Sequence, residues 1–122
     1  MTKILIVEDN ELNMRLFSDL LKTKGYQVFE CMEGKKALKM TREVKPDVVL
    51  MDIQMPEVDG LTATKLIRED PEIAKTKIIA VTAFAMDGDA DKILAGGCDS
   101  YLAKPISIPK FFQTIEDILA RK

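Results

Sequence analysis

Short strand-like runs alternate with amphipathic stretches along this chain, and the alternation limits its possible folds more than any other feature. The runs that predict strands lie at 4–7, 28–31, 47–52, 78–82 and 101–103. The stretches that predict helices lie at 11–24, 34–44, 61–69, 85–95 and from 108 onward. A strand followed by a helix, repeated five times, predicts an α/β fold whose doubly wound, five-stranded parallel sheet carries helices on both faces.

The first strand and helix carry the clearest local signals. The run Ile4-Leu5-Ile6-Val7 is apolar throughout, which predicts a strand buried on both faces. Asn10 is placed to cap the following helix, and Gly25 is placed to end it. We expect the apolar side of this helix to comprise Leu12, Leu16, Phe17, Leu20 and Leu21. We expect that of the last helix to comprise Ile108, Phe111, Phe112, Ile115, Ile118 and Leu119.

The composition narrows the possible functions. The chain has 122 residues and 47% apolar residues, which suits one domain, and its net charge of −2 opposes nucleic-acid binding. Histidine is absent, which excludes catalysis, metal ligation or phosphate carriage by histidine. No apolar run reaches the roughly 18 residues of a membrane span, and no signal peptide is visible. We therefore expect a cytoplasmic protein, with Cys31 and Cys98 as reduced thiols.

Polar residues follow four of the five predicted strands. They are Glu8 and Asp9 after the first strand, Asp52 at the end of the third, Thr82 at the end of the fourth, and Lys104-Pro105 after the fifth. In an open parallel sheet, ligands bind beyond the carboxyl ends of the strands, where the strand order reverses. In the flavodoxin-like order 2-1-3-4-5, these residues converge on one edge of the sheet.

Such a group of side chains favours binding of a metal ion and a phosphoryl group. Carboxylates a few ångströms apart repel one another unless a cation lies among them. Because all candidate ligands are oxygens, Mg²⁺ suits the site better than Zn²⁺. Lys104 adds a positive charge and Thr82 adds a hydroxyl. An acid in these surroundings can act as a nucleophile toward a phosphoryl group.

Each residue alone also has an ordinary structural explanation. Asp9 or Asn10 could simply cap the first helix, Thr82 could be an ordinary strand-end residue, and Lys104 a surface lysine. The combination at four of five strand ends is what favours a site.

The same residues resemble those of a known family. The strings "ILIVEDN", "VLMDIQMPEVDGL", "IIAVTAFA" and "YLAKPIS" are similar, in order and spacing, to the receiver domain of two-component response regulators. The resemblance extends over essentially the whole chain, residues 1–122. Further strings, "VEDNELNM", "GGC" and "KPIS", resemble stand-alone regulators of cell division in this family.

The resemblance implies a role for each site residue. Asp52 would be the phosphoacceptor. Asp9, Asp52 and the backbone carbonyl of Gln54 would bind Mg²⁺, for which Mn²⁺ can substitute, and Glu8 would contribute through water. Pro56 and Gly60 would shape the loop that leaves the site.

The resemblance also implies a switch. Thr82 would hydrogen-bond the phosphoryl group, Lys104 would pair with it, and Tyr101 would turn inward in the active state. The Lys104-Pro105 peptide bond would be cis.

The partners follow from the same resemblance. A histidine kinase or phosphotransfer protein would supply phosphate from a phosphohistidine, and Leu12, Met14 and Arg15 could dock it. The surface of the fourth helix, fifth strand and fifth helix would bind a downstream protein in control of cell division or cell polarity. The chain would be a signalling domain rather than an enzyme, without a nucleic-acid partner or membrane span.

Other functions stay open at this point. The chain could be a receiver fragment of a hybrid sensor kinase. A Mg²⁺-dependent phosphatase with an Asp nucleophile would normally have a second acid at the position of Gln54. An adaptor of the same fold that cannot be phosphorylated would have no need of the acid, threonine and lysine set.

Overall fold

The computed structural model describes residues 1–55, 58–83 and 89–121. Its elements are β1 (Lys3–Val7), α1 (Glu11–Thr23), β2 (Gln27–Cys31), the short 3-10 helix η1 (Gly34–Lys36), α2 (Ala37–Val44), β3 (Val48–Asp52), α3 (Gly60–Glu69), β4 (Lys77–Thr82), α4 (Asp89–Ala95), β5 (Ser100–Ala103) and α5 (Ile108–Ala120). The predicted elements are confirmed to within a few residues at their ends, except that 85–88 lie outside the described residues.

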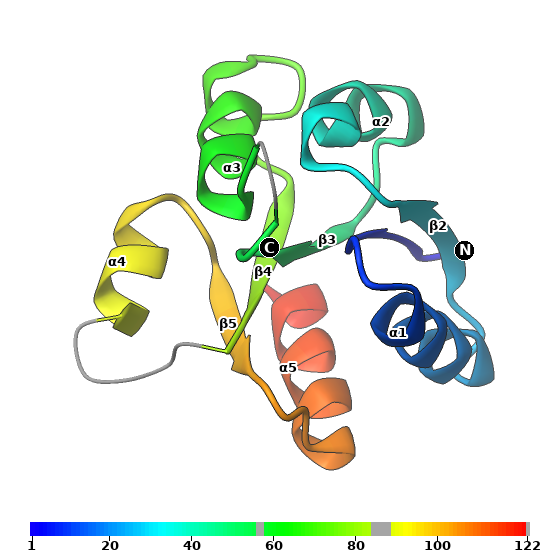
Figure 1. Cartoon of the computed structure of the whole chain (residues 1–122). Coiled ribbons are helices and arrows are strands. Elements are labelled where there is room, and N and C mark those ends of the chain that lie inside the picture. Colours follow the sequence, from blue (N-terminus) through cyan, green and yellow to red (C-terminus); the bar gives the residue numbers. More distant parts are fainter. Residues whose placement is uncertain (56–57, 84–88, 122) are drawn as a thin grey trace.

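The five strands form one parallel sheet in the order β2-β1-β3-β4-β5, as predicted. Helices α2, α3 and α4 cover one face of this sheet, and α1 and α5 cover the other (Figure 1). Successive residues of a strand point to opposite faces. Leu5 and Val7 therefore pack against α2 and α3, whereas Ile4 and Ile6 pack against α1 and α5. All four are fully buried, which confirms burial of the first strand on both faces.

Helices α1 and α3, which flank the acid cluster, each begin with a polar N-cap residue. The Asn10 side chain accepts a hydrogen bond from the Asn13 N–H (2.9 Å), which confirms the predicted cap of α1. The Asp59 side chain likewise accepts from the Thr62 N–H (2.8 Å) at the start of α3. Gly25 follows α1 with a φ of 81°, a left-handed conformation in which glycine is favoured.

The prediction of which residues of α1 face the core is partly wrong. Leu12 is 78% exposed and Leu16 is 43% exposed, whereas Met14 and Ser18 are buried beside Phe17. Leucines at i and i+4 mark a stripe on a helix, but they do not show which side of the helix faces the sheet. The buried side is set by Phe17 and Leu21, and Leu12 and Leu16 lie on a neighbouring exposed side.

The last helix shows a similar exception. Phe111, Ile115 and Ile118 are buried as predicted, but Ile108 is 47% exposed. Ile108 is the first residue of α5, so it precedes the part of the helix that lies against the sheet.

Cys31 and Cys98 are both free, as predicted, and the structure shows that both are buried. Burial raises the pKa of each thiol. Within the described ranges, no helix has the length and apolar character needed to cross a lipid bilayer.

Candidate functional site

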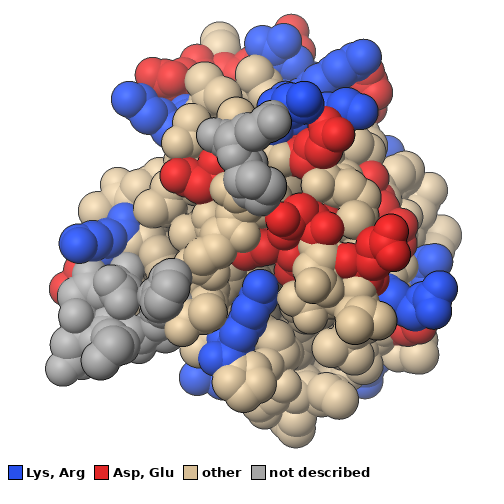
Figure 2. All heavy atoms as spheres, viewed as in Figure 1, with Lys and Arg blue, Asp and Glu red and all other residues tan. Residues whose placement is uncertain are grey.

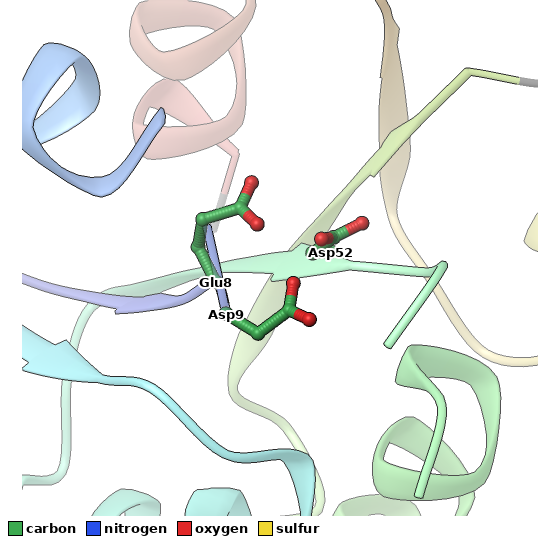
Figure 3. A group of neighbouring side chains, drawn as sticks. All are labelled: Glu8, Asp9 and Asp52. Atoms are coloured by element: carbon green, nitrogen blue, oxygen red, sulfur yellow. The ribbon is translucent and has the colours of Figure 1, made fainter. Parts of the chain in front are cut away.

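Three acidic side chains meet at the carboxyl edge of the sheet. Glu8 and Asp9 directly follow β1, and Asp52 is the last residue of β3, which pairs with β1. Figure 3 shows the three carboxylates gathered between the ends of these two strands. One oxygen from each lies within 4.8 Å of the others. Glu8 and Asp52 are buried, and Asp9 is exposed, so the cluster is open to solvent on one side.

Lys104, which directly follows the edge strand β5, also reaches this cluster. Its Nζ lies 3.6 Å from Glu8 Oε1 and 3.7 Å from Asp52 Oδ1. Its backbone N–H donates to the Thr82 carbonyl (2.8 Å), which holds the residue at the end of β4. The Lys104-Pro105 bond is cis, as predicted. Figure 2 shows one group of acidic side chains near the centre of this face with a basic side chain beside it, and further acidic side chains toward the rim.

The cluster holds more negative than positive charge. Burial and the neighbouring Asp52 carboxylate raise the pKa of Glu8 to about 8, against smaller opposing effects of the Asn10 N–H and Lys104. Glu8 Oε2 accepts from the Asn10 N–H (3.2 Å), but its buried Oε1 has no hydrogen-bond partner among the described residues. A buried carboxylate oxygen without a donor, in a set of oxygen ligands, fits a hard divalent cation such as Mg²⁺.

Thr82 lies at the end of β4, next to Asp52. Asp52 pairs with Val81, and the Ile53 N–H donates to the Val81 carbonyl (3.0 Å), so Thr82 comes just beyond this pair. The Thr82 side chain is almost completely buried. Its Oγ1 accepts a hydrogen bond from the Gln54 side-chain amide (2.8 Å).

The Gln54 side chain makes hydrogen bonds in the site that the sequence did not reveal. Its backbone N–H donates to Asp52 Oδ1 (3.1 Å), while its side-chain oxygen accepts from the Ala83 N–H (3.1 Å). From the sequence, Gln54 was expected to offer its carbonyl to the metal and to flank the site, but its hydrogen bonds to Thr82 and Ala83 were not foreseen. A polar side chain two residues beyond an acid at a strand end is the one signal that could have drawn attention to it.

Tyr101 lies on the edge strand β5, opposite Ala80 of β4. It is partly buried and packs against the core on the α2, α3 and α4 face of the sheet. Its predicted movement on activation stays a prediction.

Two glycines allow the loop after Asp52 to pack closely. A Cβ at Gly60 would lie 2.3 Å from the Asp52 carbonyl oxygen, and one at Gly34 would lie 2.0 Å from the Val58 carbonyl oxygen. Both distances are shorter than any normal contact, so these positions require glycine. The predicted role of Gly60 in shaping the loop is consistent with this packing, whereas Pro56 lies outside the described residues.

Comparison with known proteins identifies the class. The family described as "Response regulator receiver domain" matches residues 4–116. The chain therefore belongs to the response regulator receiver family. Two similar proteins are the polar-differentiation response regulators DivK of Brucella anthropi and Brucella ovis. The first is 52% identical over 116 residues, which are 95% of this chain and 94% of that protein. The second is 52% identical over 120 residues, 98% of both chains.

Solved structures agree with this assignment. The receiver domain of a Pseudomonas aeruginosa sensor histidine kinase superposes with a TM-score of 0.90 at 32% identity and 98% coverage of both chains. That structure has a magnesium ion coordinated in its active site cleft. The Vibrio cholerae chemotaxis protein CheY4 superposes with a TM-score of 0.90 at 25% identity, covering 97% of this chain and 98% of that one.

Proposed function

We propose that residues 1–122 form one receiver domain that accepts a phosphoryl group on Asp52 in a Mg²⁺-dependent reaction. The donor is a phosphohistidine of a histidine kinase or phosphotransfer protein. The observation that carries this proposal is the buried Asp52 carboxylate, which ends β3 among Glu8 and Asp9 with Lys104 Nζ 3.7 Å away.

The reaction transfers one phosphoryl group between two side chains. An oxygen of Asp52 attacks the phosphorus, the new P–O bond forms, and the bond from phosphorus to the donor's imidazole nitrogen breaks with its electrons returning to the nitrogen. Lys104 and the Thr82 hydroxyl stabilise the charge on the phosphoryl oxygens. Asp9, Asp52 and the Gln54 carbonyl would hold Mg²⁺ directly, and Glu8 would contribute through water. Mg²⁺, or Mn²⁺ in its place, would supply the positive charge that the acid cluster lacks.

The phosphorylated state changes a protein-binding surface. Thr82 moves toward the phosphoryl group, Tyr101 turns inward, and the surface of α4, β5 and α5 changes shape for a downstream protein. Support comes from the pairing of β4 with β5, in which Thr82 lies opposite Ala103, two residues after Tyr101.

The donor docks on the exposed side of α1. Leu12 and Leu16 are exposed apolar residues there, and Arg15 is exposed beside them. Met14, which the sequence suggested as a docking residue, is only 3% exposed. Its side chain belongs to the core, so it is not available to a partner.

The cellular role follows from the relatives. The DivK proteins are named for polar differentiation, and we propose that this chain acts in cell division or cell polarity in the cytoplasm. It signals by contact with proteins rather than by turning over a substrate or binding nucleic acid. The similarity to the receiver of a sensor histidine kinase makes a receiver that is part of a hybrid kinase the second candidate.

Intact-protein mass spectrometry tests the phosphoacceptor. Wild-type protein and Asp52→Asn are incubated with acetyl phosphate, with Mg²⁺ or with a chelator. We expect one phosphoryl adduct in the wild type with Mg²⁺ and none in the other three samples. An adduct of equal amount on Asp52→Asn would refute the assignment of Asp52. Steady release of phosphate from many substrates would favour a phosphatase instead.

A further inference from the structure

The side chain of Gln54 joins two groups at the end of β4. Its Nε2 donates to Thr82 Oγ1 (2.8 Å), and its Oε1 accepts from the Ala83 N–H (3.1 Å). We call this pair of hydrogen bonds the Gln54 clamp. A backbone N–H can only donate, so the side-chain oxygen must face Ala83 and the nitrogen must face Thr82. The orientation of the amide is therefore determined by its partners.

Gln54 is itself attached to the phosphoacceptor. Its backbone N–H donates to Asp52 Oδ1 (3.1 Å). The residue thus contacts the Asp52 carboxylate through its main chain and the end of β4 through its side chain. Since Asp52 is paired with Val81 across β3 and β4, the two groups in the clamp are those that directly follow the strand position opposite Asp52.

A phosphoryl group on Asp52 would compete with the Gln54 side-chain oxygen for the Ala83 N–H, and it would draw the Thr82 hydroxyl toward itself and away from the Gln54 amide. It would bring additional negative oxygens to the carboxyl edge of the sheet, and hydrogen bonds to a charged acceptor are stronger than those between neutral partners. The Thr82 hydroxyl and the Ala83 N–H are donors at that edge. In the resting structure the Ala83 N–H is used by Gln54, and Thr82 Oγ1 is held by the Gln54 amide.

We propose that Gln54 is a positioning residue that holds Thr82 and Ala83 in their resting arrangement and must release them before the phosphoryl group can bind them. This inference rests on the proposed function of Asp52. It assigns the Gln54 side chain a role distinct from that of its carbonyl, because substitution of the side chain leaves the carbonyl in place. Removing the clamp favours the phosphoryl-bound arrangement, because the competing hydrogen bonds are lost only from the resting one.

Beryllofluoride provides a direct test, because it binds a carboxylate oxygen as a phosphoryl group does. Gln54→Met retains the length of the side chain and removes both hydrogen bonds. Gln27→Met is the matched control, since Gln27 is exposed at the amino end of β2, on the opposite edge of the sheet. Gln54→Ala provides a second variant without the clamp. Each protein is titrated with beryllofluoride in Mg²⁺ and followed by amide NMR.

We expect Gln54→Met and Gln54→Ala to reach half-saturation at about threefold to tenfold lower beryllofluoride than the wild type. Before beryllofluoride is added, the Ala83 amide resonance should already have moved toward its position in the saturated wild-type protein. A purely structural effect of the substitution would not move this resonance in that direction. Gln27→Met should match the wild type in both measurements.

The outcomes separate the two proposals. If the wild type binds beryllofluoride but the Gln54 variants bind it equally or more weakly, the clamp is refuted and the phosphoacceptor stands. If the wild type does not bind it, or Asp52→Asn binds it as well, the proposed function fails and the clamp fails with it.

Discussion

Charged side chains are arranged differently at the two ends of the strands, which we call the carboxyl edge and the amino edge of the sheet. At the carboxyl edge, Glu8, Asp9 and Asp52 crowd together with Lys104, and one buried Glu8 oxygen has no hydrogen-bond partner in the described part of the chain. At the amino edge of β4 and β5, Arg68 is surrounded by acceptors. The acid cluster is incomplete, because it lacks contacts that a cation and a phosphoryl group could supply. The Arg68 site is complete, because the described residues supply acceptors for its guanidinium group.

The contacts of Arg68 show what a complete site looks like. Its Nε donates to the Gly97 carbonyl (2.9 Å), and its Nη1 donates to the carbonyls of Ala74 (2.8 Å) and Thr76 (2.6 Å). Its Nη2 donates to Asp99 Oδ2 (2.9 Å). One side chain thereby joins α3 to the segments that enter β4 and β5. Charge is used here for stability, and the difference between the edges indicates where function resides.

The largest expected effect is on the free energy of unfolding, and it comes from removing the hydrogen bonds of Arg68 at the amino edge. Arg68→Met retains much of the side chain's apolar length but leaves three carbonyls and the Asp99 carboxylate without this donor. We expect the free energy of unfolding to fall by about 3 kcal/mol, measured by urea denaturation. Asp52 should still accept phosphate when the variant is folded. A loss of phosphorylation in folded Arg68→Met would show that the two edges are not independent.

The two edges also differ in how far sequence can reveal them. Glu8, Asp9, Asp52, Thr82 and Lys104 lie at or just after strand ends, so the alternation of strands and helices was sufficient to bring them to one edge. Their positions could be predicted because parallel topology determines where strand ends meet.

Other features could not be read in this way. Arg68 binds mostly backbone carbonyls, two from the loop before β4 and one from the turn before β5, and no residue pattern marks such partners. The Gln54 clamp depends on side-chain direction, which spacing does not determine. The exposure of Leu12 and Leu16 depended on which side of α1 meets the sheet, and their spacing alone suits either answer.

The next largest effect is a pH dependence of the free energy of unfolding, caused by Glu8 in the acid cluster at the carboxyl edge. The pKa of Glu8 is raised from 4.5 to about 8, chiefly by burial and by Asp52. The folded protein therefore retains a proton that the unfolded chain loses, so this contribution to stability is complete below about pH 4.5 and is lost as pH rises toward about pH 8. In a chelator, we expect the free energy of unfolding to fall by on the order of 2 kcal/mol over this window.

Urea denaturation across the same pH range measures this slope, and Glu8→Gln is the control. A glutamine cannot ionise, so the variant should show a flatter dependence. Mg²⁺ should restore stability mainly at the upper end of the window, where Glu8 is charged and the cluster lacks positive charge. An unchanged slope in Glu8→Gln would show that another group causes the pH dependence.

A smaller effect comes from removing one charge of the cluster. Asp52→Asn relieves repulsion among the carboxylates while an amide oxygen remains to accept from the Gln54 N–H. In a chelator at neutral pH, we expect the variant to be more stable than the wild type by about 1 kcal/mol. Stabilisation by added Mg²⁺ should be weaker, because a negatively charged ligand is gone.

Asp47→Asn is the matched control, since Asp47 precedes the amino end of the same strand. It is exposed, and its Oδ2 accepts from the Lys3 N–H (2.8 Å). With no crowded acids to relieve, this variant should be no more stable than the wild type. Equal stabilisation by both substitutions would refute repulsion as the cause and would weaken the contrast between the two edges.

The smallest expected effect concerns an acid outside both edges. Asp70, which follows α3, accepts hydrogen bonds from Arg42 and from the Glu72 N–H (3.0 Å), and these contacts lower its pKa. Its contribution to stability is therefore present above its ordinary pKa of 3.8 and is lost as pH falls through the lower folded value. Arg42→Met should move the Asp70 pKa up toward 3.8, as followed by NMR titration of its carboxyl group.

The control for Arg42→Met is Lys39→Met on the same helix. Lys39 forms only a loose pair with Glu43 (3.9 Å) at an exposed position, so its loss should leave the pKa of Asp70 unchanged. Arg42 is itself half exposed, where solvent weakens ion pairs, so its substitution should change stability little at neutral pH. If Asp70 titrates identically in Arg42→Met and the wild type, the Glu72 N–H rather than Arg42 sets its pKa. This half-exposed pair, whose groups satisfy each other, is intermediate between the fully bonded Arg68 site and the acid cluster, which has an unpartnered oxygen.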